Sequence, residues 1–177
     1  MYLKISDDEF ADAELSYLEE LLGCIDKILS DVHSRIKTSV DPESEGLCDK
    51  GEYFIGVGFC AMQRYLVDVL QDKGIDKGTA LLLGPKTVEG LPISVLIHSA
   101  GNYWKHSPEW HIWMEKLDER SQKTIDRLLT HDGPAWYPLS EVLAGLCDAG
   151  EFSLLRCIPY LKKWRQAVDG KVAHKNA

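Results

Sequence analysis

The sequence predicts an all-α protein, an antiparallel bundle of about five to six helices with one long N-terminal helix. Apolar residues recur at three- and four-residue spacing through the first part of the chain, which is the period of an amphipathic helix. Later apolar segments are separated by clusters of Gly, Pro, Ser and Asp, and strand and helix patterns do not alternate. The chain has 177 residues, enough for one sizeable core, so residues 1–177 are expected to form a single helical domain.

The long helix is predicted from Asp7 to Lys37. Ser6 and Glu9 fit the N-cap and N3 positions of a capping box, which marks its start. Its apolar stripe consists of Leu15, Leu18, Leu22, Ile25, Leu29, Val32 and Ile36. We expect this stripe to face the core of the bundle, with the surface of a homodimer as the alternative. Turn residues at 41–46 end the helix.

A central buried helix is predicted from Gly51 to Gln71, which is apolar on nearly all sides. A pair of strands is the alternative, and the length favours the helix. Gly56 and Gly58 are interpreted as positions that let another helix come close. With Ala61 they also fit a loose Gly-x-Gly-x-x-Ala dinucleotide fingerprint, but no strand-helix-strand unit surrounds it.

The rest of the chain is predicted to alternate between helices and turns. Residues from Gly74 to Gly90 are expected to be irregular around a short turn at 79–83, and Gly84 to Thr87 to form a turn rather than the end of a phosphate-binding loop. The remaining helices are predicted at Pro92–His106, Pro108–Thr130, Ser140–Cys147 and Glu151–Val168, the last kinked or restarted at Pro159. Ser107 as N-cap and Pro108 at N1 are expected to restart a helix directly after the preceding one. The polar residues 170–177 are expected to fray.

The composition excludes a general DNA- or RNA-binding surface. The chain has 20 Lys and Arg against 28 Asp and Glu, a formal net charge of −8. A surface of that sign does not attract phosphate backbones, so RNA or nucleotide binding would need a local basic or His-lined site. The same charge is compatible with a basic protein partner.

Cysteine usage and the chain start predict a cytoplasmic location. The cysteines at 24, 48, 60, 147 and 157 form an odd set without a C-x-x-C pair, and are interpreted as buried free thiols in a reducing compartment. The N-terminus lacks the basic and apolar regions of a secretory signal. The longest apolar run, Tyr53 to Met62, is about half of a membrane span, so no membrane association is expected.

One face of the helix predicted at Pro92–His106 carries the candidate site. His98, Asn102 and His106 recur every four residues on its polar side, together with Lys105. A solvated helix face is the simpler interpretation. The functional one is favoured because His106 lies at a helix end, where the partial negative charge stabilises an imidazolium and suits an acid or base.

A family resemblance lies in the same segment. The stretch from Gly101 to Trp110, Gly-Asn-Tyr-Trp-Lys-His-Ser-Pro-Glu-Trp, is similar to an Asn-Tyr-aromatic-Lys-His block of small bacterial proteins. It also resembles the Arg-Asn-x-x-x-His signature of the HEPN superfamily. That resemblance implies a four- or five-helix bundle, often dimeric, and a metal-independent endoribonuclease of a toxin-antitoxin or phage-defence system.

Residue by residue, the resemblance makes His106 the catalytic histidine and Asn102 its polar neighbour. Gly101 stands where the signature has Arg, which removes a bidentate phosphate contact. Lys105, Arg64 and His98 are the candidate substrate-binding residues that would supply polar contacts in its place. No cofactor is expected.

No metal site is predicted either. His98 and His106 are two helical turns apart, about 12 Å along the axis, which is too far for one ion unless His111 or an acidic residue closes the gap.

Other features have structural interpretations. Lys162 to Arg165 is read as a set of cations favoured by the C-terminal turn of a helix rather than as a phosphate contact. The tryptophans at 104, 110 and 113 are read as core anchors. The alternative function is a non-enzymatic interaction module, an immunity, antitoxin or accessory protein, which binds a basic partner through its acidic surface.

Overall fold

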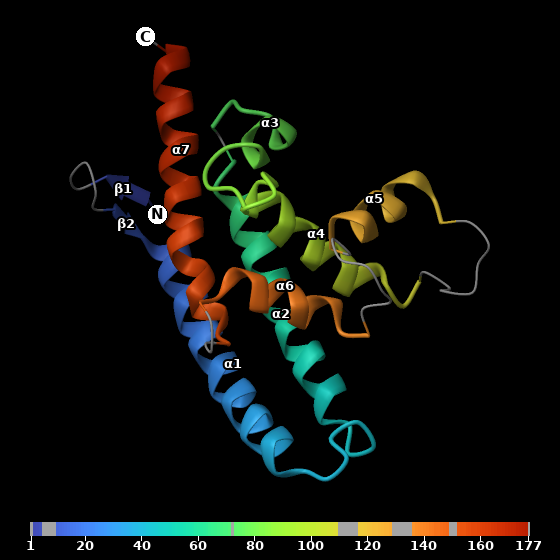
Figure 1. Ribbon diagram of the computed structural model, residues 1–177. Helices are drawn as coiled ribbons and strands as arrows, with labels where there is room; N and C mark the ends of the chain where they lie inside the picture. The colour runs from blue at the N-terminus through green and yellow to red at the C-terminus, as the bar shows by residue number, and fades with distance from the viewer. Residues whose placement is uncertain are drawn as a thin grey trace.

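The computed structural model describes residues 2–4, 10–71, 73–109, 117–128, 136–148 and 152–176. Its α-helices are α1 (Ala13–Thr38), α2 (Leu47–Asp68), α3 (Lys77–Leu81), α4 (Ile93–His106), α5 (Glu119–Leu128), α6 (Pro138–Leu146) and α7 (Ile158–Asn176). A 3-10 helix, η1 (Leu154–Cys157), precedes α7, and the strands β1 (Tyr2–Lys4) and β2 (Phe10–Asp12) form a hairpin. The predicted all-α bundle with a long first helix is confirmed (Figure 1).

The start of the long helix differs from the prediction. Residues 10–12 belong to β2, which pairs with β1 in an antiparallel register, so the helix begins at Ala13 and not at Asp7. Asp12 is its N-cap and accepts a hydrogen bond from the Leu15 amide at 3.1 Å. The other carboxylate oxygen of Asp12 accepts from the Tyr65 hydroxyl at 2.7 Å. The predicted capping box, Ser6 to Glu9, lies outside the described residues.

The apolar stripe of α1 faces the interior of the chain itself. Its buried members are Leu15, Leu18, Leu22, Ile25, Leu29 and Val32. They pack against α2, which runs back alongside α1 after the turn at 41–46 (Figure 1). The stripe therefore serves the intramolecular core, as the sequence favoured.

The segment predicted as a central helix is α2, and the alternative of two strands is wrong. Both of its glycines are positions of close packing. A Cβ at Gly56 would lie 1.7 Å from Trp104 Cδ1, and one at Gly58 would lie 2.5 Å from Leu154 Cδ1. These contacts confirm the helix-packing interpretation and leave no backbone loop for a dinucleotide.

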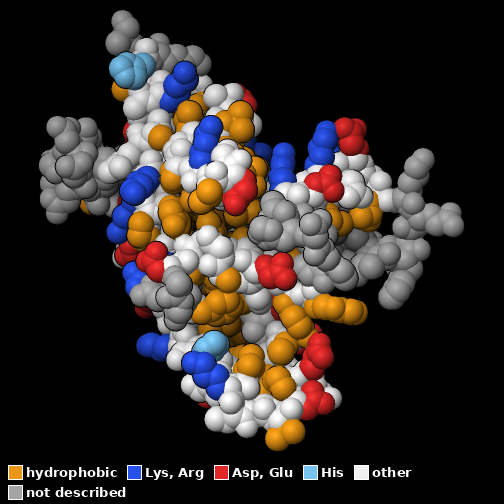
Figure 2. Space-filling model, in the orientation of Figure 1, with side chains coloured by type: hydrophobic (Ala, Val, Ile, Leu, Met, Phe, Trp, Pro, Cys, Tyr) orange, Lys and Arg blue, Asp and Glu red, His pale blue; other side chains and the backbone are white. Residues whose placement is uncertain are grey.

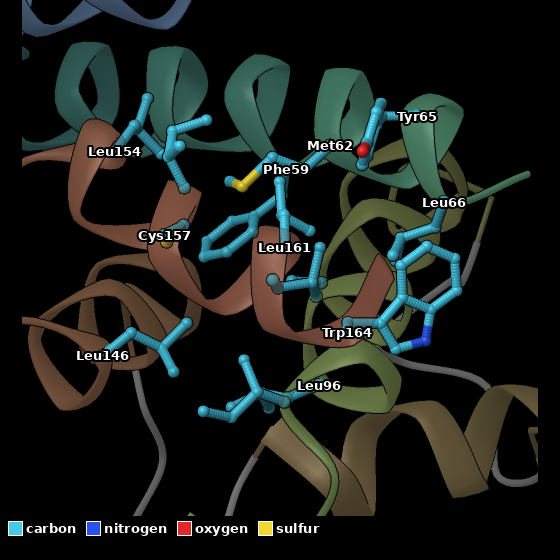
Figure 3. Close-up of a cluster of buried hydrophobic side chains, with 14 of the residues drawn as sticks. Phe59, Met62, Tyr65, Leu66, Leu96, Leu146, Leu154, Cys157, Leu161 and Trp164 are labelled. Carbon is cyan, nitrogen blue, oxygen red and sulfur yellow. The ribbon is translucent and has the colours of Figure 1, made fainter. Parts of the chain in front are cut away.

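The main core lies where α2, α4, η1 and α7 meet. Figure 3 shows Phe59, Met62 and Leu66 of α2 facing Leu154, Leu161 and Trp164. Trp164 is 1% exposed and its indole N–H donates to the Ala80 carbonyl at 2.9 Å, which ties α3 to α7.

Within the predicted irregular segment, α3 is the one short helix and Gly84 adopts φ of 80°. A Cβ at Gly84 would be 2.9 Å from Trp164 Cα, so this turn needs glycine.

The prediction for the fourth helix is wrong at its start. Residues 107–109 form a turn, and Ser107 is the C-cap of α4 rather than an N-cap. The helix α5 begins at Glu119, after Asp118 has accepted hydrogen bonds from the amides of Arg120 and Ser121 at 2.8 and 3.1 Å. Trp110 and Trp113 fall outside the described residues.

Two acidic side chains from distant helices hold the C-terminal elements. Glu52 of α2 accepts from the amides of Leu139 and Ser140, at 2.7 and 2.9 Å, and so caps α6 from outside. Asp26 of α1 accepts from the Leu154 amide at 2.8 Å and from the Ser153 hydroxyl at the start of η1.

The C-terminal helix is confirmed but its end is not. The 3-10 helix precedes α7, so the helix restarts at Ile158, next to Pro159. It continues to Asn176, past the predicted end at Val168 and through residues that were expected to fray. Residues 162–165 therefore lie in the first half of the helix and not, as was predicted, in its C-terminal turn.

Two further observations concern surface properties. Of the cysteines, Cys157 is buried but Cys24 is exposed, so the expectation of buried thiols fails for Cys24. Among the described helices, none combines the length and the hydropathy that a membrane crossing requires.

Candidate functional site

A groove between α2 and α4 collects most of the polar residues singled out in the sequence. Its volume is about 600 Å³. It is lined by Cys60, Gln63, Arg64, Val67, Asp68, Gln71, Lys77, His98, Asn102 and Lys105. The structure thus brings four of the predicted site residues together, Arg64, His98, Asn102 and Lys105, and leaves His106 outside the lining.

Close antiparallel packing of α2 on α4 forms the floor of this groove. The Cys60 thiol donates to the Gly101 carbonyl at 3.3 Å. Burial raises the pKa of Cys60, so this thiol is protonated at neutral pH. A Cβ at Gly101 would lie 3.1 Å from both Cβ and Oε1 of Gln63, closer than an ordinary contact. Glycine at 101, where the HEPN signature has Arg, is therefore explained by helix packing.

A chain of hydrogen bonds fixes the orientation of each polar group on this floor. The Gln63 Nε2 group donates to the His98 carbonyl at 3.0 Å, and only the amide nitrogen can do so. The same nitrogen donates to Asn102 Oδ1 at 2.7 Å, which turns Asn102 Nδ2 toward His98 Nδ1 at 3.3 Å. Because Nδ2 is a donor, Nδ1 must be the acceptor. His98 is therefore the neutral tautomer with its proton on Nε2.

The electrostatics of the groove favour an anion. Burial, and then the positive charges of Lys77, Lys105 and Arg127, lower the pKa of His98 to about 4. The imidazole is neutral at pH 7 and sits among three cationic side chains, two of which line the groove. A neutral N–H donor beside ammonium groups is suited to the oxygens of a phosphate or carboxylate.

Arg64 adds a third cation to the groove wall. Its Nε donates to both carboxylate oxygens of Asp68, at 2.8 and 2.7 Å. The Arg64 side chain is 76% exposed, so this pair contributes little to stability. The ion pair with Asp68 holds the guanidinium of Arg64 at the rim of the groove. The pair uses Nε and not the two terminal amino groups.

His106 occupies a different environment. It is the last residue of α4 and its side chain is 48% exposed. Its Nδ1 lies 3.3 Å from Glu109 Oε2 in the turn that follows. The four-residue spacing correctly placed Asn102 near His98, but the predicted catalytic His106 is not among the residues that line the groove with its polar neighbour Asn102.

Sequence reasoning missed six of the ten residues that line the groove, and two of these, Gln63 and Lys77, act on His98. Gln63 is 6% exposed, and a buried amide in a nearly apolar helix was the signal that it makes polar contacts. Lys77, at the start of α3, has no local signal, because only the tertiary fold brings it beside α4.

Other candidate chemistry is not assembled in the described part of the chain. There, no group of three or more His, Cys, Asp or Glu side chains is arranged to hold a metal ion. Trp104 packs on Gly56 and meets Tyr53 edge to face at 5.5 Å, in keeping with a packing role. Of the cluster at 162–165, Trp164 is core and Lys162 pairs with Glu19 at 3.0 Å.

A scan against protein-family models, a search of curated proteins and a search of solved structures each found nothing that matches this chain.

Proposed function

We propose that this chain is a HEPN-like helical protein whose α2–α4 groove binds the phosphate group of RNA or of a nucleotide. The observation that carries the proposal is the placement of His98 in one groove with Arg64, Lys77 and Lys105, where burial and then nearby positive charges lower its pKa and keep the imidazole neutral. Three cationic side chains line the groove against one carboxylate, that of Asp68. This excess of positive charge is confined to the groove, since the whole chain has a net charge of −8.

The groove offers complementary donors for phosphate oxygens. The Nε2–H of His98 and the ammonium groups of Lys77 and Lys105 can each donate a hydrogen bond to a phosphate oxygen. A bound dianion offsets the burial cost of the imidazolium, so binding is expected to raise the pKa of His98. Asn102 and Gln63 act as positioning residues, because their hydrogen bonds set the tautomer of His98.

These contacts support recognition of the ligand without cleavage. Cleavage next to a ribose 2′-hydroxyl needs a base and an acid within reach of the same phosphate. The free nitrogen of His98 carries a proton and the other accepts from Asn102, so this histidine is a donor and not a base. His106 is paired with Glu109 at the helix end. The groove supports RNA or nucleotide binding, and the resemblance is the basis for proposing that the chain does so as a member of a toxin-antitoxin or phage-defence system.

Fluorescence anisotropy with a 5′-labelled 12-nucleotide single-stranded RNA tests the proposal. Wild-type protein is compared with Lys105→Glu and with Lys50→Glu, an equal charge reversal at an exposed position outside the groove. We expect Lys105→Glu to weaken binding roughly tenfold, as for loss of a charged hydrogen bond, and Lys50→Glu to change it much less. Equal losses in the two variants contradict a local site.

The same samples test cleavage. After overnight incubation we expect intact RNA on a denaturing gel. Cleavage that His106→Ala abolishes contradicts recognition without cleavage and favours the ribonuclease implied by the resemblance.

A basic protein partner is the second candidate. Its supporting observation is the exposed acidic turn between α1 and α2, with Asp41, Glu43 and Glu45. Figure 2 shows Lys and Arg side chains among Asp and Glu side chains on the face it draws, so the acidic excess is not uniform. Absence of any RNA or nucleotide binding favours this candidate over the groove.

A further inference from the structure

A second apolar face runs along α1, separate from its buried stripe. It consists of Tyr17, Leu21, Cys24 and Ile28, at successive spacings of four, three and four residues. Tyr17 is 69% and Leu21 44% exposed, Cys24 is exposed and Ile28 is partly buried. This is the spacing of a coiled-coil seam, presented on the outside of the helix.

Two opposite charges border one edge of this seam. Glu20 and Lys27 are one heptad apart, so they project along the same side of α1, and both are exposed. The structure gives neither of them an ion pair with a described residue. Gly23 lies between them and supplies no side chain on this side of the helix. Leu155 of η1, 38% exposed, packs next to Gly23, on the other side of this charged edge.

We propose that this face binds the same face of a second copy of the chain, with the two α1 helices antiparallel. In that direction Glu20 of one copy meets Lys27 of the other, and the pair forms twice around a two-fold axis beside residues 22–23. Tyr17 then meets Ile28, and Leu21 meets Cys24, across the axis. A parallel pair would place the edge with Glu20 and Lys27 of one helix against the opposite edge of the other, where Leu18 and Ile25 are buried, so the two charges would not meet.

The size of the face sets the strength of the association. From Tyr17 to Ile28 the seam is about 17 Å long, which is short for a stable dimer. The dimer is therefore expected to be reversible, with dissociation in the micromolar range. No α1 residue lines the α2–α4 groove, so this surface and the proposed phosphate site can fail independently.

Sedimentation velocity over a concentration series from 1 to 200 µM tests the proposal on the full chain. We expect a monomer–dimer equilibrium in the wild type and a monomer in Leu21→Glu, a change at an exposed position that leaves the core intact. Glu20→Lys and Lys27→Glu are each expected to weaken the dimer, and the double variant to restore it. A wild-type monomer at 200 µM, a dimer that resists Leu21→Glu, or a double variant weaker than both single ones overturns the proposal.

Oxidative cross-linking tests whether the two seams meet. With copper phenanthroline as the oxidant, two Cys24 thiols close to the axis lose two protons and two electrons and form one disulfide. We expect a covalent dimer that Cys24→Ser abolishes and Cys48→Ser retains, since Cys48 lies outside the seam. A cross-link that survives Cys24→Ser overturns the seam as the contact between the two copies.

Discussion

His98 gives the most quantitative prediction, because its environment sets a pH dependence of folding. Its pKa falls from 6.5 to about 4 on folding. Above pH 6.5 the imidazole is neutral in both states and contributes nothing. Between pH 6.5 and 4 the unfolded chain takes up a proton that the folded chain refuses, so stability is lost as the pH falls.

The size of this loss follows from the shift. A difference of about 2.5 units at 1.36 kcal/mol per unit gives about 3 kcal/mol, and partial solvent contact of the ring reduces it to about 2 to 3 kcal/mol. The whole free energy of unfolding of a small domain is only a few times larger than this loss. The contribution is therefore large enough to measure.

Urea unfolding followed by circular dichroism at pH 7, 6, 5 and 4 checks this value. The comparison is with His98→Gln, which keeps an acceptor for Asn102 and has no titrating ring. We expect the wild type to lose about 2 to 3 kcal/mol more than His98→Gln between pH 7 and 4. His106→Gln, at the exposed end of α4, is the control and should follow the wild type. Parallel curves for wild type and His98→Gln, or an NMR midpoint of His98 near 6.5, refute the account of its environment.

The remaining predictions concern packing and capping, and urea unfolding at pH 7 measures them all. Gly56→Ala is expected to destabilise the fold by about 2 to 4 kcal/mol, because its Cβ would lie 1.7 Å from Trp104 Cδ1. Gly145→Ala is the matched helical control: nothing lies within 4 Å of its Cβ position, and it should stabilise by about 0.5 to 1 kcal/mol. Glu52→Ala should cost about 2 to 3 kcal/mol, because it leaves two amides at the start of α6 without their acceptor, and Glu52→Gln about half as much.

Helix periodicity predicted the fold because most helices here bury one face. The apolar stripe of α1 and the apolar surface of α2 identified the helices that form the core. Boundaries failed where a tertiary contact decided them. Asp12 caps α1 while it accepts from Tyr65, fifty-three residues away, and no local pattern contains that contact. The predicted start of α5 failed for a local reason instead: Asp118 caps the helix through the amide of Ser121, three residues on, and the Ser-Pro pair at 107–108 is not the start signal.

The candidate site was predictable on α4 but not across helices. One helix face carries His98, Asn102 and Lys105, so their spacing was sufficient to group them. Gln63 and Lys77 line the groove only because of how α2 and α3 pack on α4. The same packing explains Gly101, which the sequence could describe only as a departure from the signature.

The imidazole NMR signals of His98 test the central claim most directly. Two-dimensional spectra of 15N-labelled protein are recorded with adenosine monophosphate and, as control, with adenosine, which lacks the phosphate. The account predicts an Nε2-protonated His98 whose signals shift with the monophosphate alone, together with the side-chain amides of Asn102 and Gln63, and a pKa of His98 that rises on binding. Equal shifts with adenosine, or shifts confined to residues outside the α2–α4 groove, contradict it.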